Sequence, residues 1–198
     1  MRAYAEVWAL QKDLLLARQR DEIDDTLVLV EHPHVITMGR GADRANLLDA
    51  ADVPVFEIER GGDVTYHGPG QLVGYPILLL REDERDLHQY LRRLEEVLIR
   101  TLADLGLRAG RRPGWTGVWC AEHKLASIGV AVKKWVTMHG FALNVCTDLR
   151  RFAAINPCGL QATVMASVES ELARPVATGE VRPGLLVHFA EVFARRWE

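Results

Sequence analysis

The sequence has little of what secreted and membrane proteins need. It contains three cysteines, Cys120, Cys146 and Cys158, and an odd number without a secretion signal indicates free thiols, not a disulfide framework. The first residues lack the apolar run of a signal peptide, and no stretch approaches the roughly 20 apolar residues of a membrane span. We therefore expect a cytoplasmic protein that does not contact a membrane.

The charge balance gives no sign of a nucleic-acid-binding protein. Lysine and arginine number 24 against 27 acidic residues, for a net charge of -3, so only local basic patches are available to a partner. The chain also lacks internal repeats, low-complexity segments and a Ser/Gly/Pro-rich spacer, while hydrophobic residues make up 48% of it. We expect one domain over residues 1–198, acting as a monomer.

One stretch, Arg60–Gln71, has an unusual composition. Its sequence, Arg-Gly-Gly-Asp-Val-Thr-Tyr-His-Gly-Pro-Gly-Gln, cannot form a regular helix or a central strand. It lacks both the Gly-Lys-Ser/Thr ending and the Gly-x-Gly-x-x-Gly spacing of phosphate-binding loops. Its glycines let the backbone approach a ligand closely. We predict a binding loop, with an ordinary surface loop as the alternative.

Two histidine-containing motifs have metal-ligand spacing but lack partners. His32 and His34 flank a proline, and Cys120 is followed three positions later by His123. A structural zinc site needs four ligands, and no second Cys/His pair completes either motif. We therefore predict no metal site and turn roles for the histidine pair.

Hydrophobic periodicity predicts an α+β fold, with a mixed or antiparallel sheet flanked by helices. Helices are expected over 4–20, over 86–105, and from 182 to about 196 with Pro183 near the first turn. A helical turn is expected over 148–155, and 162–172 is left open between strand and helix. Strands are expected at 26–30 (buried), 35–38, 72–80 (with Pro76 at an irregularity or a sheet edge), and consecutively at 115–120, 124–132 and 135–145.

Cys158 is the cysteine whose surroundings favour exposure. It lies between Pro157 and Gly159, whereas Cys120 and Cys146 are interpreted as small buried hydrophobes. A reactive thiolate needs a nearby base or cation. The candidates are His67, His123, His139 and Lys124, of which Lys124 opens an otherwise apolar strand.

Five segments in order along the chain resemble the octanoyltransferases of lipoate synthesis, also called lipoate-protein ligase B. They are Glu31-His32-Pro33 with Thr37-Met38-Gly39-Arg40, the whole of Arg60–Gln71, Lys124–Gly129, His139–Val145 and Asn156–Leu160. Two departures are modest: Asp63 stands where Gln is common, and Met165-Ala166-Ser167-Val168 replaces a more usual Thr-Ser pattern.

The resemblance implies a fold shared with biotin ligases and ATP-dependent lipoate ligases. It also implies an activity without a cofactor, in which an octanoyl group passes from acyl carrier protein through a thioester on Cys158. The acceptor is then a lysine of lipoyl domains, in the E2 subunits of 2-oxo acid dehydrogenases and in the glycine cleavage H protein. Cys158 and Lys124 form the implied catalytic dyad, with Lys124 acting either as a base or as a cation that stabilises the thiolate.

An eight-carbon chain needs an apolar slot, and the same segments supply candidate walls. Backbone N–H groups of 158–160 and 127–129 are candidates for stabilising the oxyanion. Tyr66 and His67 either orient the carbonyl end or fix their own loop. The expected substrate-binding residues are Arg60, Gly61, Gly62, Asp63, Val64, Thr65, Tyr66, His67, Ser127, Ile128, Gly129, Gly140, Phe141 and Ala142.

The carrier is acidic in this interpretation, so a basic docking patch is expected. Its candidates are Arg108, Arg111 and Arg112, or Lys133 and Lys134. Three other functions stay open at this point: an ATP-dependent lipoate ligase, a cysteine-dependent thioesterase, and a non-catalytic module that binds lipoyl domains or acyl carriers.

Overall fold

A six-stranded antiparallel sheet forms the centre of the computed structural model, which describes residues 1–50, 53–157 and 162–196. Its strands lie in the order β1 (Thr26–Val30), β5 (Gln71–Ile77), β9 (Val136–Asn144), β8 (His123–Lys133), β7 (Trp115–Cys120) and β6 (Gly110–Arg112). The consecutive strands expected over residues 115–145 are therefore β7, β8 and β9, and their antiparallel pairing is confirmed.

A smaller mixed sheet lies beside the first. It has the order β3 (Val55–Glu57), β2 (Val35–Met38) and β4 (Val64–His67), with β3 parallel and β4 antiparallel to β2. The Arg60–Gln71 stretch is thus not a plain loop, because β4 occupies its middle and Gln71 begins β5. As an edge strand, β4 agrees with the exclusion of a central strand.

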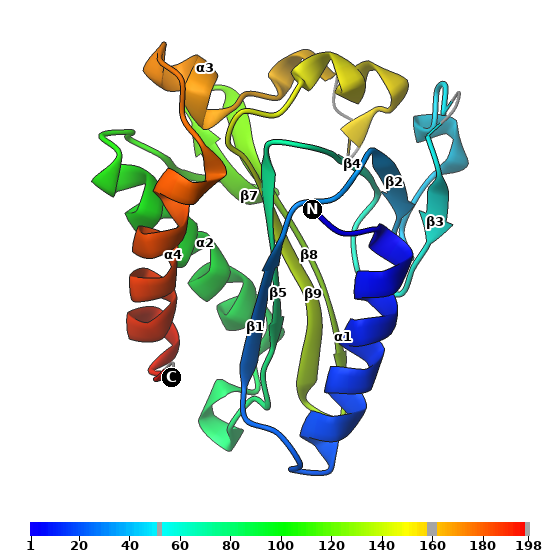
Figure 1. Ribbon diagram of the computed structural model, residues 1–198, viewed down its shortest axis with the longest axis vertical. Helices are drawn as coiled ribbons and strands as arrows, with labels where there is room; N and C mark the ends of the chain where they lie inside the picture. Colours follow the sequence, from blue (N-terminus) through cyan, green and yellow to red (C-terminus); the bar gives the residue numbers. More distant parts are fainter. Residues whose placement is uncertain (51–52, 158–161, 197–198) are drawn as a thin grey trace.

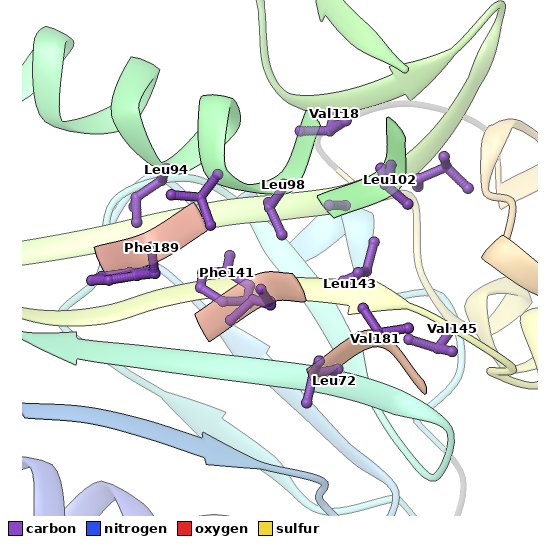
Figure 2. Close-up of a cluster of buried hydrophobic side chains, with 14 of the residues drawn as sticks. Leu72, Leu94, Leu98, Leu102, Val118, Phe141, Leu143, Val145, Val181 and Phe189 are labelled. Atoms are coloured by element: carbon purple, nitrogen blue, oxygen red, sulfur yellow. The ribbon is translucent and has the colours of Figure 1, made fainter. Parts of the chain in front are cut away.

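Helices cover both faces of the large sheet. Helix α1 (Tyr4–Gln19) packs on one face, and α2 (Leu87–Asp104) and α4 (Thr178–Phe193) cover the other (Figure 1). The main core lies between α2, α4 and the sheet, where Leu94 and Leu98 meet Phe141 and Phe189 (Figure 2). Removing such apolar surface from water is the main force that holds these layers together. The expected α+β class is confirmed.

Local signals fix the ends of helix α2. The Asp86 carboxylate accepts hydrogen bonds from the N–H groups of His88 and Gln89 at 2.8 and 3.1 Å, which satisfies amides that have no partner inside the helix. Gly106 ends the helix at a φ of +87°, a conformation that glycine adopts without a steric penalty. The predicted boundaries 86–105 are therefore accurate.

Pro76 lies in strand β5, which is an inner strand. Of the two alternatives expected at Pro76, the sheet edge is therefore wrong and the irregularity is confirmed. Pairing of β5 with β9 ends at Gly74 opposite Phe141, before the proline. The Thr137 hydroxyl then donates to the Pro76 carbonyl at 2.7 Å and accepts from the N–H of Leu78 at 3.0 Å. A side chain thus replaces ladder bonds that proline cannot make.

Two further expectations need correction, and one open alternative is resolved. Strand β1 is an edge strand in which only Val30 is fully buried, so it is not the buried strand that its composition predicted. Helix α4 begins at Thr178, which places Pro183 inside the helix and not in its first turn. The segment left open at 162–172 forms a 3-10 turn (Ala162–Val164) and helix α3 (Val168–Leu172).

The remaining short elements are 3-10 turns. They are Arg44–Asn46, Glu82–Glu84 and Leu149–Ala154, the last of which confirms the helical turn expected over 148–155. None of the helices in the described part of the chain is both long and apolar enough to cross a membrane.

Candidate active site

A cavity of about 330 Å³ lies between the segment around β4 and strands β5, β8 and β9. Apolar side chains line much of it, among them Ile58, Val73 and Phe141. Of the described residues that were expected at the site, all but Tyr66 line this cavity. Those that do line the cavity are Lys124, Arg60, Gly61, Gly62, Asp63, Val64, Thr65, His67, Ser127, Ile128, Gly129, Gly140, Phe141 and Ala142.

Strand β8 borders the cavity because β7 covers only part of its edge. Pairing of β7 with β8 runs from Cys120 opposite His123 to Val118 opposite Ala126, with a register shift after Val118. Further along, the N–H of Gly61 donates to the carbonyl of Val130 at 2.8 Å. Since backbone groups alternate sides along a strand, Ile128 presents its N–H and C=O to this same edge. Polar backbone groups are therefore available beside an apolar slot.

Buried Arg60 ties the segment between β3 and β4 to strand β2 of the small sheet. Its Nη2 donates to the carbonyl and the hydroxyl of Thr37 at 2.8 and 3.1 Å, and its Nη1 donates to the carbonyl of Gly61 at 3.0 Å. A Cβ at Gly129 would lie 3.0 Å from both Arg60 Cδ and the Gly61 carbonyl oxygen. The absence of a side chain at Gly129 thus lets this loop pack directly on β8.

Asp63 holds a neighbouring loop. Its carboxylate accepts hydrogen bonds from the side chain of Asn46 at 2.6 Å and from the N–H groups of Asp43 and Val64 at 3.2 and 2.7 Å. The carboxylate is therefore engaged with the chain itself, and its contribution to the cavity is the position of the wall.

A chain of hydrogen bonds connects His67 to the far side of the site. His67 Nδ1 lies 2.8 Å from Gln71 Oε1, and the Gln71 amide donates to Asn144 Oδ1 at 2.9 Å and to the Tyr66 carbonyl at 3.2 Å. Because Gln71 donates through its nitrogen, its oxygen accepts, and His67 carries its proton on Nδ1. Burial also lowers the pKa of His67 to about 3, so the ring is neutral and its Nε2 is an acceptor.

The same chain ends beside Lys124. The Asn144 amide donates to the Ala166 carbonyl at 3.0 Å, and the N–H of Ala166 donates to the Lys124 carbonyl at 3.0 Å. Lys124 is only 2% exposed although it opens a strand, and its Nζ lies 5.6 Å from the ring centroid of Trp119. Met165, one of the residues that depart from the family pattern, forms an isolated bridge with Lys124.

Cys158, the expected nucleophile, lies outside the described residues, together with 159–161. The chain on either side of this gap is described. Pro157 is buried, Asn156 donates its N–H to the carbonyl of Asn46 at 2.8 Å, and the chain returns at Ala162, three residues before Met165.

Tyr66 lies apart from the cavity. Along β4 the side chains alternate between faces, so Thr65 and His67 line the cavity while the Tyr66 ring packs at 5.2 Å from that of Phe152. Its hydroxyl is hydrogen-bonded to His34 Nδ1 at 2.6 Å, and burial raises its pKa to about 12. The Tyr66 side chain is therefore engaged with His34 and Phe152 and does not line the cavity.

One end of the cavity holds two tyrosines that were not anticipated, Tyr4 and Tyr75, beside His139, which the sequence offered as a candidate base. The Tyr4 ring stacks on His67 with centroids 6.1 Å apart, and Tyr75 donates its hydroxyl proton to His32 Nε2 at 2.8 Å, because His32 Nδ1 donates to a carbonyl. His139 also lines this end, and burial lowers its pKa to about 4 although the Glu59 carboxylate, 3.7 Å away, acts in the opposite direction. Tyr4 reaches this end of the cavity from α1, whereas Tyr75 and His139 come from the paired strands β5 and β9.

Glu95 is a further residue that was missed. Its side chain is fully buried, and it accepts hydrogen bonds from Arg92 at 2.6 Å, from Arg111 at 3.0 Å and from the N–H of Gly117 at 3.1 Å. A signal was present in the sequence, because position 95 falls on the apolar face of α2 beside Leu91 and Leu98. Glu95 therefore ties α2 to β6 and to β7, the strand that pairs with the one carrying Lys124.

Two of the three arginines considered for docking, Arg111 and Arg112, have partners within the chain, whereas Arg108 is exposed. Arg111 also pairs with Glu96 at 2.9 Å, and Arg112 pairs with Glu122 at 3.1 Å. Lys133 and Lys134 are exposed at the turn between β8 and β9. His123 is exposed and hydrogen-bonded to Glu171 at 2.9 Å, and no set of three potential metal ligands gathers within the described ranges.

The fold and this site define a catalytic domain of the lipoyl ligase type. The model of the lipoyl protein ligase A/B catalytic domain matches residues 3–190. Among solved structures, lipoate-protein ligase A bound with ATP superposes with a TM-score of 0.77 at 19% identity, over 96% of this chain and 83% of that chain. A bipartite lipoate protein ligase from Thermoplasma acidophilum gives 0.73 at 20% identity, over 96% and 81%.

Sequence relatives narrow the class. An octanoyltransferase of Syntrophotalea carbinolica is 51% identical over 94% of this chain and 88% of that protein, and one of Gloeobacter violaceus is 50% identical over 98% and 88%. The chain belongs to the lipoyl protein ligase A/B catalytic domain family and, within it, to the octanoyltransferases, a group of acyltransferases.

Proposed function

We propose that the protein transfers an octanoyl group from octanoyl-acyl carrier protein to the ε-amine of a lysine on a lipoyl domain. The acyl group passes through a thioester on Cys158. The acceptors are the lipoyl domains of 2-oxo acid dehydrogenase E2 subunits and the glycine cleavage H protein, and the reaction takes place in the cytoplasm with the enzyme as a monomer. The observation that carries the proposal is a buried lysine, Lys124, at an apolar cavity large enough for a medium-length acyl chain.

The chemistry needs no ATP, because a thioester donor is already activated. The Cys158 thiolate attacks the acyl carbonyl carbon and the carrier's thiol leaves, which gives an acyl-enzyme. The acceptor amine then attacks the same carbon, Cys158 leaves as the thiolate, and the amine loses one proton to form a stable amide. Backbone N–H groups at the exposed edge of β8, such as that of Ile128, are suited to stabilise the oxyanion.

Two contacts support a pairing of Cys158 with Lys124. Met165 and Ala166, shortly after the cysteine in sequence, are bonded to the backbone of Lys124. The hydrogen-bond chain from His67 also ends at Ala166. The wall residues Arg60, Asp63 and Gly129 act through the shape of the slot, and Ile58, Val73 and Ala142 supply its apolar surface.

Intact-protein mass spectrometry tests the proposal. After mixing with octanoyl-acyl carrier protein, the wild type should gain one octanoyl group, and addition of a lipoyl domain should move that group to the domain without ATP. The adduct should be absent in Cys158→Ser and present in the matched control Cys146→Ser. Cys146 is exposed, and the expectation that it is buried was wrong. Wild-type turnover by Cys158→Ser would refute the acyl-enzyme. Turnover only with ATP would indicate a ligase, and release of free octanoate with no acceptor would indicate a thioesterase.

A further inference from the structure

Trp119 and Lys124 lie opposite each other on neighbouring strands, and both are buried. They are cross-strand partners in the ladder between β7 and β8, at 3% and 2% exposure. The ammonium nitrogen of Lys124 lies 5.6 Å from the centroid of the Trp119 ring, within the range of a cation–π interaction. Such an interaction stabilises the charged form of lysine and has no counterpart for the neutral amine.

The orientation of Trp119 favours this contact over a hydrogen bond. Its indole Nε1 is buried and has no hydrogen-bond partner among the described residues, although buried indole N–H groups usually find one. The ring also faces a second cation, since the Arg112 guanidinium lies 4.9 Å from its centroid. Trp115, which lines the cavity, meets the same ring edge-on at 6.4 Å.

The end of the Lys124 stem lies against a second residue of β7. Gly117 leaves room for it, because a Cβ there would lie 2.9 Å from Lys124 Cε. The N–H of Gly117 is held by the buried carboxylate of Glu95. Two residues of the same strand, Gly117 and Trp119, therefore adjoin the end of the lysine side chain.

Burial acts against this arrangement, since removal from water disfavours the charged form of a lysine. The pair is surrounded by ionisable groups from several elements. They are Glu95 of α2 with Arg92 and Arg111, Arg112 of β6 with Glu122, Cys120 of β7, His123 of β8 with Glu171 of α3, and His67 of β4.

We propose that Trp119 is a positioning residue that holds Lys124 as an ammonium ion, so that Lys124 enters the reaction as a cation and not as a neutral base. This inference rests on the proposed function for its catalytic meaning, while the charge state of Lys124 is measurable without turnover. As a cation, Lys124 stabilises the thiolate of Cys158 and then the departing thiolate of the acyl-enzyme. The proton lost by the acceptor amine then has to pass to another group or to water.

Titration of the lysine side chains tests the inference directly. The chain's lysines are Lys12, Lys124, Lys133 and Lys134, so protein labelled with 13C at the lysine ε-carbon gives few signals, and Lys124→Met identifies the one of interest. In the wild type, Lys124 should titrate well above pH 7. In Trp119→Leu its midpoint should fall by about 0.5 to 1.5 pH units, and in Trp119→Phe by less.

A control variant and a control lysine distinguish the loss of the cation–π interaction from a general loosening of the packing. Arg112→Gln removes a competing cation from the same ring, so it should leave the Lys124 midpoint unchanged or raise it, whereas general loosening would move both variants alike. Lys12, whose Nζ lies 3.3 Å from the Trp8 ring centroid, should titrate identically in the Trp119 variants.

Activity gives the second readout. In Trp119→Leu, the pH above which kcat/KM declines should be lower than in the wild type, and it should fall together with the Lys124 midpoint measured by NMR. A wild-type Lys124 midpoint below pH 7, or a midpoint unmoved in a folded Trp119→Leu or Trp119→Phe, would overturn the inference. If the wild type forms no octanoyl adduct, the proposed function fails while the charge-state result stands.

Discussion

The side chain of Lys124 lies where a side chain on Gly117 would have to be. Gly117 has a φ of +130°, and a Cβ built on it would lie 2.4 Å from the Ala126 carbonyl oxygen and 2.9 Å from Lys124 Cε. The lysine stem fills the room that a side chain at position 117 would need. The backbone of β7 is therefore part of what places the Lys124 ammonium group.

Substitution Gly117→Ala should disturb this arrangement strongly. The new methyl group meets a backbone oxygen and the lysine stem in a conformation that is already unfavourable for alanine, so we expect a loss of about 2–4 kcal/mol of unfolding free energy. Octanoyl transfer should fall at least 10-fold in protein that remains folded. Gly106→Ala is the control, because Gly106 also has a positive φ but nothing within 4 Å of its Cβ position. Equal effects of the two substitutions would contradict the steric account.

Glu95→Ala should destabilise the protein through a buried charge network. The buried carboxylate accepts the N–H of Gly117 and pairs with Arg92 and Arg111, so its removal leaves that buried N–H without its acceptor and the two partly exposed arginines without this counter-ion. We expect a loss of about 2–4 kcal/mol in urea unfolding. In the matched variant Glu96→Ala, the lost pairs are partly exposed, and the change should stay below about 1 kcal/mol. A smaller effect at Glu95 than at Glu96 would refute the role of Glu95 in holding β7.

Acid should weaken the fold through the buried histidines. The folded-state pKa values of His67 and His139 are lowered to about 3 and about 4, against about 6.5 in the unfolded chain. Between these values the unfolded chain binds more protons, so the stabilisation is complete above pH 6.5 and is lost as the pH falls. The unfolding free energy should decline by up to about 1.4 kcal/mol per pH unit for each histidine.

Urea titrations at several pH values between 7 and 4.5 measure this decline. His67→Asn keeps a donor in the place of Nδ1 and removes the titrating ring, so its stability should depend less steeply on pH than that of the wild type. Parallel curves for the two proteins would show that His67 does not contribute to the acid sensitivity.

A larger side chain at Ala142 should shorten the acyl slot. Ala142 is 4% exposed, lines the cavity and packs with Val73 and Ile58. We expect Ala142→Val to lower kcat/KM for octanoyl donors about 10-fold and to affect hexanoyl donors less, measured as transfer from each carrier to a lipoyl domain. Ala131→Val, on the same sheet but outside the cavity, should leave the ratio unchanged. A constant ratio in Ala142→Val would mean that the acyl chain lies elsewhere.

Tyr66→Phe should separate loop fixing from substrate contact. The substitution removes the hydrogen bond to His34 and keeps the packing against Phe152, so the unfolding free energy should fall by about 1 kcal/mol. KM for the octanoyl donor should not change, since Tyr66 does not line the cavity. A raised KM at unchanged stability would restore the substrate contact that the motif predicts.

Local signals in the sequence located most elements, because they depend on neighbouring residues. The periodicity of α2 and its stop at Gly106 predicted that helix closely, and the turn residues separated β7, β8 and β9. Pro183 was misleading, because a proline usually marks the first turn of a helix but here lies inside α4. Pro76 was ambiguous, since the Thr137 hydroxyl that compensates for it is distant in sequence.

The site was predictable only where a motif is contiguous. Most of the Arg60–His67 and Lys124–Gly129 residues line one cavity, but neither segment indicates which side chains face it. The alternation of β4 decided that for Tyr66. Tyr4, Tyr75 and His139 join the site through tertiary packing, and the contact of Trp119 with Lys124 depends on the register of two strands.

The length and the width of the cavity depend on different residues, because hydrogen bonds made by Arg60 and Gly61 set its width. The N–H of Gly61 bonds the segment between β3 and β4 to the carbonyl of Val130 in the large sheet, and Arg60 holds the same segment on the carbonyl of Thr37 in the small sheet. The distance between the walls is therefore set by the main chain and does not depend on the apolar side chains. Substitutions along the lining change how far a ligand reaches, whereas loss of the Arg60 guanidinium changes how thick a ligand the gap admits.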